Sequence, residues 1–227
     1  MTGTTPSLFD LPDAAGDVGA AAGTPDLPAG AVHVPGWLTE VQQQDLLDRV
    51  ATWARGPVAP ARPHTASGEM SSRMLCLGRH WVPTAPRGHR YFDRAVDGNG
   101  APVLPVPPEL VTLARRAVFA ATGDGRAAGR YSPDIAVVNI YGPDAHMGMH
   151  RDDDEASEAP VVSLSLGAAC RFRFGNATDR SRPYTDLTLA PGDLFVFGGP
   201  ARWNFHGVQK ILDPATRVNI TVRESGL

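Results

Sequence analysis

Two segments of the chain have apolar residues at helical spacing. The first follows Thr39-Glu-Val-Gln42, a sequence typical of a capping box, and Gly56-Pro57 ends it. Its apolar stripe consists of Leu38, Val41, Leu46, Leu47, Val50 and Trp53. The second begins at Pro107-Pro108, where proline suits the first helical turn, and ends near Gly123. The pattern therefore predicts two amphipathic helices in the first half of the chain.

From Ile135 onward the pattern changes to short apolar runs separated by Gly, Pro and Asp. The runs cover residues 135–141, 161–166, 170–174, 186–189, 194–197, 203–206 and 218–222. Strand-length runs at such even spacing are typical of an antiparallel sandwich or barrel. The chain is therefore expected to be α+β, with helices first and a β-rich second half.

Two stretches lack this regularity. Residues 1–30 are rich in Ala, Gly, Pro, Asp and Thr, so they are predicted to form a disordered tail. Residues 56–106 are dense in Pro, Gly and Arg, and only Met74–Leu77 and Tyr91–Phe92 resemble strands. Long irregular stretches inside compact domains are often binding loops or lids. We expect one domain over residues 31–227, with a lid at 56–106 and a β-rich core at 131–227.

The amino-acid composition argues against several classes of protein. The 227 residues are 42% hydrophobic and 20% charged, and the formal net charge of −3 argues against a large non-specific nucleic-acid surface. No apolar stretch reaches the roughly 20 residues that a membrane helix needs, and the start of the chain lacks a secretory-signal pattern. The two cysteines, Cys76 and Cys170, do not indicate a disulfide framework. We expect a cytoplasmic monomer without a membrane span.

A candidate metal site comes from residues far apart in the sequence. His150 and Asp152 lie two apart, so an extended backbone would point both side chains to one face. With His206 they make two imidazoles and one carboxylate, the ligand set of non-haem iron(II) oxygenases. A His-x-Asp pair alone is weak, because His150 could be a solvated loop residue and His206 a core imidazole. Assigning these three residues to a metal site therefore depends on other motifs in the chain.

One such motif is Arg217-Val-Asn-Ile-Thr-Val-Arg223 near the end of the sequence. Alternation along a strand places its two arginines, Asn219 and Thr221 on one face. If this face is buried, the arginines need an anion, and a guanidinium can hold a carboxylate with two hydrogen bonds. The segment ending in Asn139-Ile-Tyr141 repeats the alternation. The alternative is that these arginines are solvated charges on an edge strand.

At this point the chain resembles a known family. Its motifs are Asn139-Ile-Tyr141, His150-Arg-Asp152, Ser163-Leu-Ser-Leu-Gly167, Pro191-Gly-Asp193, Phe205-His-Gly207 and Arg217-Val-Asn-Ile-Thr-Val-Arg223. They occur in the order seen in AlkB-type dioxygenases, which use iron(II), 2-oxoglutarate and dioxygen to demethylate alkylated nucleobases. The resemblance is close over about residues 137–226. It implies a double-stranded β-helix (jelly-roll) core with flanking N-terminal helices and a nucleotide-recognition lid.

The resemblance also implies roles for individual residues. His150, Asp152 and His206 would bind iron. Arg217 would bind the far carboxylate of 2-oxoglutarate, assisted by Asn139, Tyr141 and Asn219, and Arg223 would lie near the metal-bound end. Asp154 would face the base and Trp81 would stack on it, whereas Tyr91 and Arg87 would make polar lid contacts. The alternative for the lid residues is a core tryptophan and exposed loop side chains.

The predicted activity is oxidative demethylation of bases in DNA, of the 1-methyladenine and 3-methylcytosine type. Its products would be formaldehyde, succinate and carbon dioxide, and the partner would be alkylated DNA, with RNA as a further candidate. An extruded base is needed, because a stacked base cannot reach such a site. Alternatives are the same chemistry on RNA, a protein or a small molecule, or a jelly-roll that binds metal or nucleic acid without catalysis.

Overall fold

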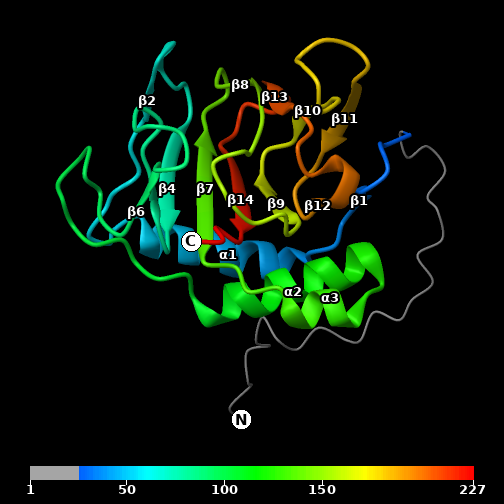
Figure 1. The fold of residues 1–227 in the computed structure, drawn as a ribbon, viewed down its shortest axis with the longest axis horizontal. Coiled ribbons are helices and arrows are strands. Elements are labelled where there is room, and N and C mark those ends of the chain that lie inside the picture. The colour runs from blue at the N-terminus through cyan, green and yellow to red at the C-terminus, as the bar shows by residue number, and fades with distance from the viewer. Residues whose placement is uncertain (1–25) are drawn as a thin grey trace.

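Two antiparallel sheets build the molecule (Figure 1). The structure, a computed structural model, describes residues 26–227. The six-stranded major sheet has the order β1-β12-β9-β14-β7-β4 and the four-stranded minor sheet the order β11-β10-β13-β8. The strands of the major sheet are β1 (Ala31–Val34), β4 (Arg73–Leu77), β7 (Ile135–Tyr141), β9 (Val161–Gly167), β12 (Leu194–Phe197) and β14 (Arg217–Arg223). Those of the minor sheet are β8 (Met147–His150), β10 (Cys170–Phe174), β11 (Thr185–Leu189) and β13 (His206–Ile211).

Three helices lie along the side of the major sheet that faces away from the minor sheet (Figure 1). They are α1 (Glu40–Trp53), α2 (Pro108–Thr122) and α3 (Gly125–Arg130). Thr39 and Gln42 form the capping box at the start of α1. Leu46 and Leu113 pack in one cluster with the sheet residue Ile220. The helices thus bury the apolar face of the major sheet and leave its other face to the minor sheet.

Aromatic side chains fill the space between the two sheets. Phe172 and Phe174 from the minor sheet contact Phe195 from the major sheet edge-to-face, with ring centroids 5.1 Å apart in both pairs. Such pairs contribute about 0.5–1.5 kcal/mol beyond the burial of their area. Since Phe197 lies 4.9 Å from the ring of His206, this apolar layer ends directly at the site described below. The jelly-roll core expected from the sequence is confirmed.

Short two-stranded ribbons make up much of the region between α1 and α2. They are β2 (His64–Thr65) with β3 (Gly68–Glu69), and β5 (His80–Trp81) with β6 (Tyr91–Phe92). Strand β4 lies inside the predicted 56–106 region but pairs with β7, so residues 73–77 belong to the major sheet. The ribbons extend from that edge of the sandwich.

Several local expectations need correction. The predicted strand at 203–206 is wrong, because Gly199–Ala201 form a short 3-10 helix, a turn follows, and β13 begins only at His206. Strand β8 and helix α3 had no clear apolar pattern and were not predicted. Val41, assigned to the buried stripe, is 60% exposed. Cys76 and Cys170 are buried free thiols.

The predicted tail, residues 1–30, lies partly outside the residues that the structure describes. Residues 1–25 lie outside the described residues, whereas the backbone of Gly30 accepts a hydrogen bond from Gly198 and Asp26 accepts one from Thr185. Within residues 26–227, no helix is long and apolar enough to cross a membrane.

Candidate active site

Three side chains with metal-ligand chemistry meet at the edge of the minor sheet. His150 ends β8 and His206 begins β13, and the two residues are directly paired across these strands. Asp152 follows two residues after His150 and is buried. One ligand atom of each residue lies within 4.8 Å of the others. The pairing of β8 with β13 therefore brings together residues that are 56 positions apart in sequence.

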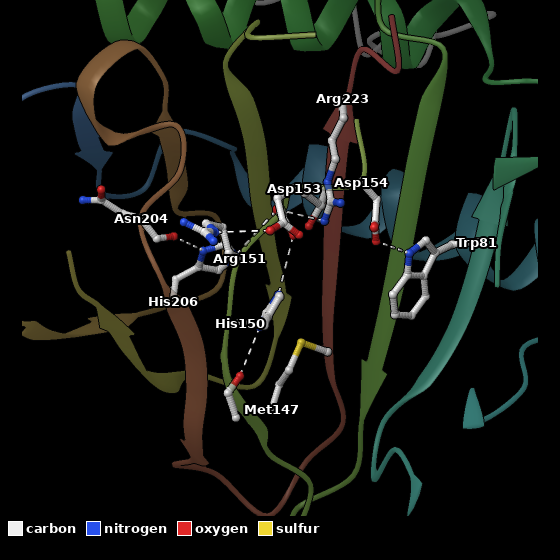
Figure 2. A network of polar contacts seen from close by, with 12 residues as sticks. Trp81, Met147, His150, Arg151, Asp153, Asp154, Asn204, His206 and Arg223 are labelled. Carbon is white, nitrogen blue, oxygen red and sulfur yellow. Dashed lines mark hydrogen bonds and ion pairs between the residues drawn. The ribbon is translucent and has the colours of Figure 1, made fainter. Parts of the chain in front are cut away.

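Backbone carbonyls orient both imidazoles. Nδ1 of His150 lies 3.1 Å from the oxygen of Gly148, and Nδ1 of His206 lies 3.0 Å from that of Asn204. A carbonyl accepts only, so each Nδ1 is the protonated nitrogen and each Nε2 keeps its lone pair. Both Nε2 atoms lie 3.6 Å from an oxygen of Asp152 (Figure 2). Three lone-pair donors therefore converge on one point.

The charges of the triad suit a cation. Burial opposes ionisation of Asp152, but the positive charge of Arg223 and of the neighbouring imidazoles outweighs it and lowers the pKa of Asp152 to about 2. Burial and the nearby His150 lower the pKa of His206 to about 4. At neutral pH the site thus has an ionised carboxylate and an uncharged imidazole. Oδ2 of Asp152 has no hydrogen bond among the described residues, although Arg223 Nη2 lies 3.0 Å away. This donor set fits a divalent metal such as iron(II).

The polar face of β14 is buried at Arg217 and Thr221 and partly buried at Asn219 and Arg223. Strand β14 pairs with β9 on one side and β7 on the other, so the edge-strand alternative is wrong. Asn219 donates to Ser163 Oγ at 2.7 Å and accepts from the hydroxyl of Thr221. Asn139 lies opposite Asn219 and Tyr141 lies opposite Arg217, as the alternation in the two strands requires.

A small cavity of about 40 Å³ lies beside the triad. Besides the three triad residues, its polar lining consists of Asn139, Tyr141, Ser163, Asn219, Thr221 and Arg223. Burial raises the pKa of Tyr141, so its hydroxyl remains protonated, and its one donated hydrogen bond goes to the weak acceptor Met147 Sδ at 3.7 Å. The side-chain oxygen of Asn139 is buried without a hydrogen bond inside the described part of the chain. Several polar groups therefore face a narrow space next to the metal-ligand set.

Arg217 is 1% exposed and lies beyond this lining. Its guanidinium donates to the Ala168 carbonyl at 3.2 Å and to Ser165 Oγ at 3.1 Å. Within residues 26–227 no carboxylate forms an ion pair with it. A buried guanidinium without a counter-charge is costly. Its environment therefore fits an anionic ligand.

A second, larger cavity of about 880 Å³ extends from the triad to the β5–β6 ribbon. Trp81 Nε1 donates to Asp154 at 2.8 Å (Figure 2), and Arg90 donates to the same carboxylate at 3.1 Å. The structure thus brings the predicted pair Trp81 and Asp154 together on the wall of this cavity. Arg87 is exposed and ion-pairs with Asp153 at 3.0 Å across the mouth.

Tyr91 occupies a different environment from that of an open lid residue. It is buried, and its hydroxyl donates to the carboxylate of Glu155. Glu155 and Arg202 are both buried and were not singled out from the sequence. Arg90 was also missed. Glu155 follows an exposed-looking acidic run, and nothing in the local pattern around Arg90 or Arg202 distinguishes them from surface arginines.

Comparison with known proteins identifies the family. The profile of the 2OG-Fe(II) oxygenase superfamily matches residues 30–223. An alpha-ketoglutarate-dependent dioxygenase AlkB homolog of Caulobacter vibrioides is 37% identical over 201 residues, covering 84% of this chain and 86% of its own length. AlkB of Escherichia coli is 36% identical over 164 residues, covering 69% of this chain and 73% of its own length.

A further relative and a solved structure also match. A DNA N(6)-methyladenine demethylase of Arabidopsis thaliana, ALKBH1C, is 36% identical over 61% of this chain and 33% of its own length. The solved structure of OsALKBH1 has a TM-score of 0.76 at 29% identity and covers 88% of this chain and 98% of that chain. The chain therefore belongs to the AlkB family of 2OG-Fe(II) oxygenases, dioxygenases that use iron(II), 2-oxoglutarate and dioxygen.

Proposed function

We propose that this dioxygenase demethylates alkylated bases in DNA, with 1-methyladenine and 3-methylcytosine as the lesion type. The observation that supports it most directly is the Trp81–Asp154 pair on the wall of the 880 Å³ cavity, which opens onto the triad. The indole offers an apolar face to a base, and the carboxylate offers a negative charge. Bases methylated at these ring positions are cationic, so Asp154 favours them over their neutral parents.

In this proposal His150, Asp152 and His206 hold iron(II). Arg217 binds the far carboxylate of 2-oxoglutarate, and Asn139, Tyr141 and Asn219 assist it along the small cavity. Arg223 lies near the metal-bound end, where its ion pair with Asp152 also fixes that carboxylate. When bound, iron(II) with 2-oxoglutarate and dioxygen would supply the oxidation of the N-methyl carbon, which releases formaldehyde, with succinate and carbon dioxide as coproducts.

The side chains around the large cavity orient the base. Arg90 and the Trp81 N–H share the Asp154 carboxylate, so the direction of this carboxylate is set. Arg87 and Arg180 also line the cavity and can contact phosphates beside an extruded nucleotide. Tyr91 supports the wall from within through Glu155. A lesion that already weakens pairing lowers the cost of extrusion.

The test is a panel of DNA and RNA oligonucleotides that contain single 1-methyladenine, 3-methylcytosine or N6-methyladenine residues. The protein is incubated with iron(II), 2-oxoglutarate and oxygen, and the oligonucleotides are weighed by mass spectrometry. We expect a loss of 14 mass units from the two cationic lesions in DNA, as one methyl group is replaced by hydrogen. Asp152→Ala is the inactive control. No change in any methylated DNA, with 2-oxoglutarate still consumed, would assign the enzyme to another substrate.

DNA N6-methyladenine is a second candidate, because the plant relative ALKBH1C is named as its demethylase. This base is neutral, so an attractive carboxylate is not needed to recognise it. Asp154→Asn separates the two cases. We expect the substitution to lower kcat/KM for cationic lesions by about tenfold or more, the effect of losing roughly 1.4 kcal/mol of charge attraction. An equal or greater activity on N6-methyladenine in both proteins would favour the second candidate.

A further inference from the structure

Arg202 is a fully buried arginine that contacts neither cavity. It lies in the turn after the 3-10 helix, four residues before His206, and is 1% exposed. Its guanidinium donates to three acceptors: the Asp152 backbone carbonyl at 2.6 Å, the Ala159 carbonyl at 2.9 Å and the Glu155 carboxylate at 3.1 Å. Neither cavity lining includes it. Its hydrogen bonds to these three partners connect it to the site.

All three acceptors belong to one irregular segment. Residues 151–160 join β8 to β9 and contain no helix or strand. Asp152 therefore has no sheet hydrogen bonds to fix its backbone. Arg202 holds the segment near its start, middle and end, at Asp152, Glu155 and Ala159. Together with the backbone hydrogen bonds of Ala156 and Ser157 to Ser225, this guanidinium gives the segment the support that regular secondary structure gives to the two histidines.

The same arginine belongs to a closed ring of interactions. Glu155 accepts from Arg202 with one oxygen and from Arg223 at 2.9 Å with the other. Arg223 ion-pairs with the Asp152 side chain at 3.0 Å, and Asp152 returns to Arg202 through its backbone oxygen. Since the ring is buried, each contact is stronger than it would be in water, and removing one member leaves charges unpaired.

We propose that Arg202 is a positioning residue for the metal site. It holds the Asp152 carboxylate at a set distance from His206, because it precedes His206 by only four residues and hydrogen-bonds the backbone of Asp152. Through Glu155 it also fixes the direction of Arg223. The metal affinity of the triad thus depends on a residue that touches neither metal nor cosubstrate. This inference rests on the metal site and not on the nucleic-acid substrate proposed above.

The test measures metal binding alone. Arg202→Met and Arg202→Lys are compared with the wild type by circular dichroism, thermal melting, and titration with Co(II) followed by its visible absorption spectrum. We expect Arg202→Met to raise the Co(II) dissociation constant about 10- to 100-fold, the range found when groups that orient metal ligands are removed. Arg202→Lys keeps the charge but makes fewer hydrogen bonds, so its affinity should be intermediate.

Arg115→Met is the matched control. Arg115 also donates to a backbone carbonyl, that of Tyr131 at 2.7 Å, but it lies on α2 away from the triad. Its loss should lower the melting temperature and leave Co(II) binding unchanged. A folded Arg202→Met with wild-type Co(II) affinity would overturn the proposal and leave Arg202 a purely structural residue. If Arg202→Met does not fold, wild-type affinity in Arg202→Lys at a reduced melting temperature has the same meaning.

Glu155→Gln gives an independent readout. The amide still accepts from Arg202 but no longer balances the charge of Arg223. We expect Glu155→Gln to raise the dissociation constant of 2-oxoglutarate more than that of Co(II). Arg202→Met should instead raise the Co(II) constant more. Because no oligonucleotide is present, these results stand whether or not the enzyme acts on DNA. Identical changes in both constants for both variants would contradict separate roles for the two residues.

Discussion

Arg217 is a buried charge whose surroundings suit a ligand better than they suit the folded protein. Two neutral acceptors share its guanidinium, and its Nε has no partner in residues 26–227. Replacing such a group by an apolar side chain of similar length removes a desolvation cost from folding. The same change removes the positive charge that binding of a dicarboxylate requires.

Arg217→Met should therefore fold at least as stably as the wild type and lose 2-oxoglutarate binding. Thermal melting and isothermal titration calorimetry measure the two effects. Arg173→Met is the control, since Arg173 pairs with Asp186 at 2.6 Å on the minor sheet outside the site. Retained 2-oxoglutarate turnover in Arg217→Met would show that the far carboxylate binds elsewhere.

Gly207 allows His206 to approach β8. A Cβ at this position would lie 2.6 Å from the Met147 carbonyl oxygen and 2.9 Å from backbone atoms of Gly148. These are backbone atoms of the paired strand, so they cannot move aside without separating β13 from β8. Gly148, one strand away, has open space where its own Cβ would lie.

Gly207→Ala should weaken Co(II) binding by about 10- to 100-fold, because it displaces His206 from His150. Gly148→Ala should bind Co(II) like the wild type, and the same visible-absorption titration compares them. Equal affinities in the two variants would mean that the strands adjust without moving the imidazoles.

The metal and 2-oxoglutarate residues predicted from sequence lie in short motifs with recognisable spacing. His150 and Asp152, or Arg217 and Asn219, are two apart, so alternation alone places each pair on one face. Arg202 and Arg90 could not be found this way. Arg202 meets Glu155 across 47 residues and Arg90 meets Asp154 across 64, and only the assembled fold makes those contacts.

At the scale of elements, helices were easier to predict than strand boundaries. The capping box at Thr39 and the prolines before α2 are local signals whose effect does not depend on distant partners. Strand β13 has no such signal. Its sequence, His-Gly-Val-Gln-Lys-Ile, has few apolar residues, and pairing with β10 and β8 decides where it begins. The apolar run at Trp203 therefore suggested a strand in the wrong place.

Strand β1 is joined to the turn before β12 by a buried hydrogen bond between His33 and Asp193. Asp193 lies 2.8 Å from His33 Nε2 and also accepts from the backbone N–H groups of Gly36 and Ala190. Burial of Asp193 opposes its ionisation, but these hydrogen bonds outweigh it and lower the pKa of Asp193. The folded state therefore binds a proton at Asp193 less readily than the unfolded chain does.

The stability that Asp193 contributes should be complete above the ordinary aspartate pKa of 3.8 and disappear as the pH falls through the lower pKa of the folded state. Urea unfolding from pH 7 to pH 2.5 compares the wild type with Asp193→Asn. The difference in unfolding free energy between the two proteins should be constant at the upper end of this pH range and shrink below about pH 4. A difference that does not change with pH would exclude an ionised Asp193 as its source.

At the scale of the whole molecule, the site connects both sheets. The two histidines come from the minor sheet, the arginines from the major sheet, and Asp152 from the segment between them. Ligands that bind across these parts stabilise only the assembled sandwich. Ligand binding therefore raises the free energy of unfolding. At a ligand concentration one hundred times Kd, this increase is about 2.7 kcal/mol.

Adding Mn(II) with 2-oxoglutarate should raise the melting temperature by about 5–10 °C for a domain of this size, and a chelator should reverse the shift. Differential scanning fluorimetry measures both. Asp152→Ala serves as the control that should not respond. A wild-type melting temperature that is unaffected by the pair at saturating concentration would argue against a site shared between the sheets.

The position of β14 has a consequence for how the protein is made. This strand lies between β7 and β9, yet both partners precede it in the chain, with Tyr141 paired to Arg217 across 76 residues. During synthesis the two older strands are ready long before the strand that must fill the gap between them. Until residues 217–223 leave the ribosome, β7 and β9 expose unpaired edges, which are the surfaces that nucleate aggregation. Ribosome pausing or truncation just before Arg217 is thus the point at which this chain most needs a chaperone.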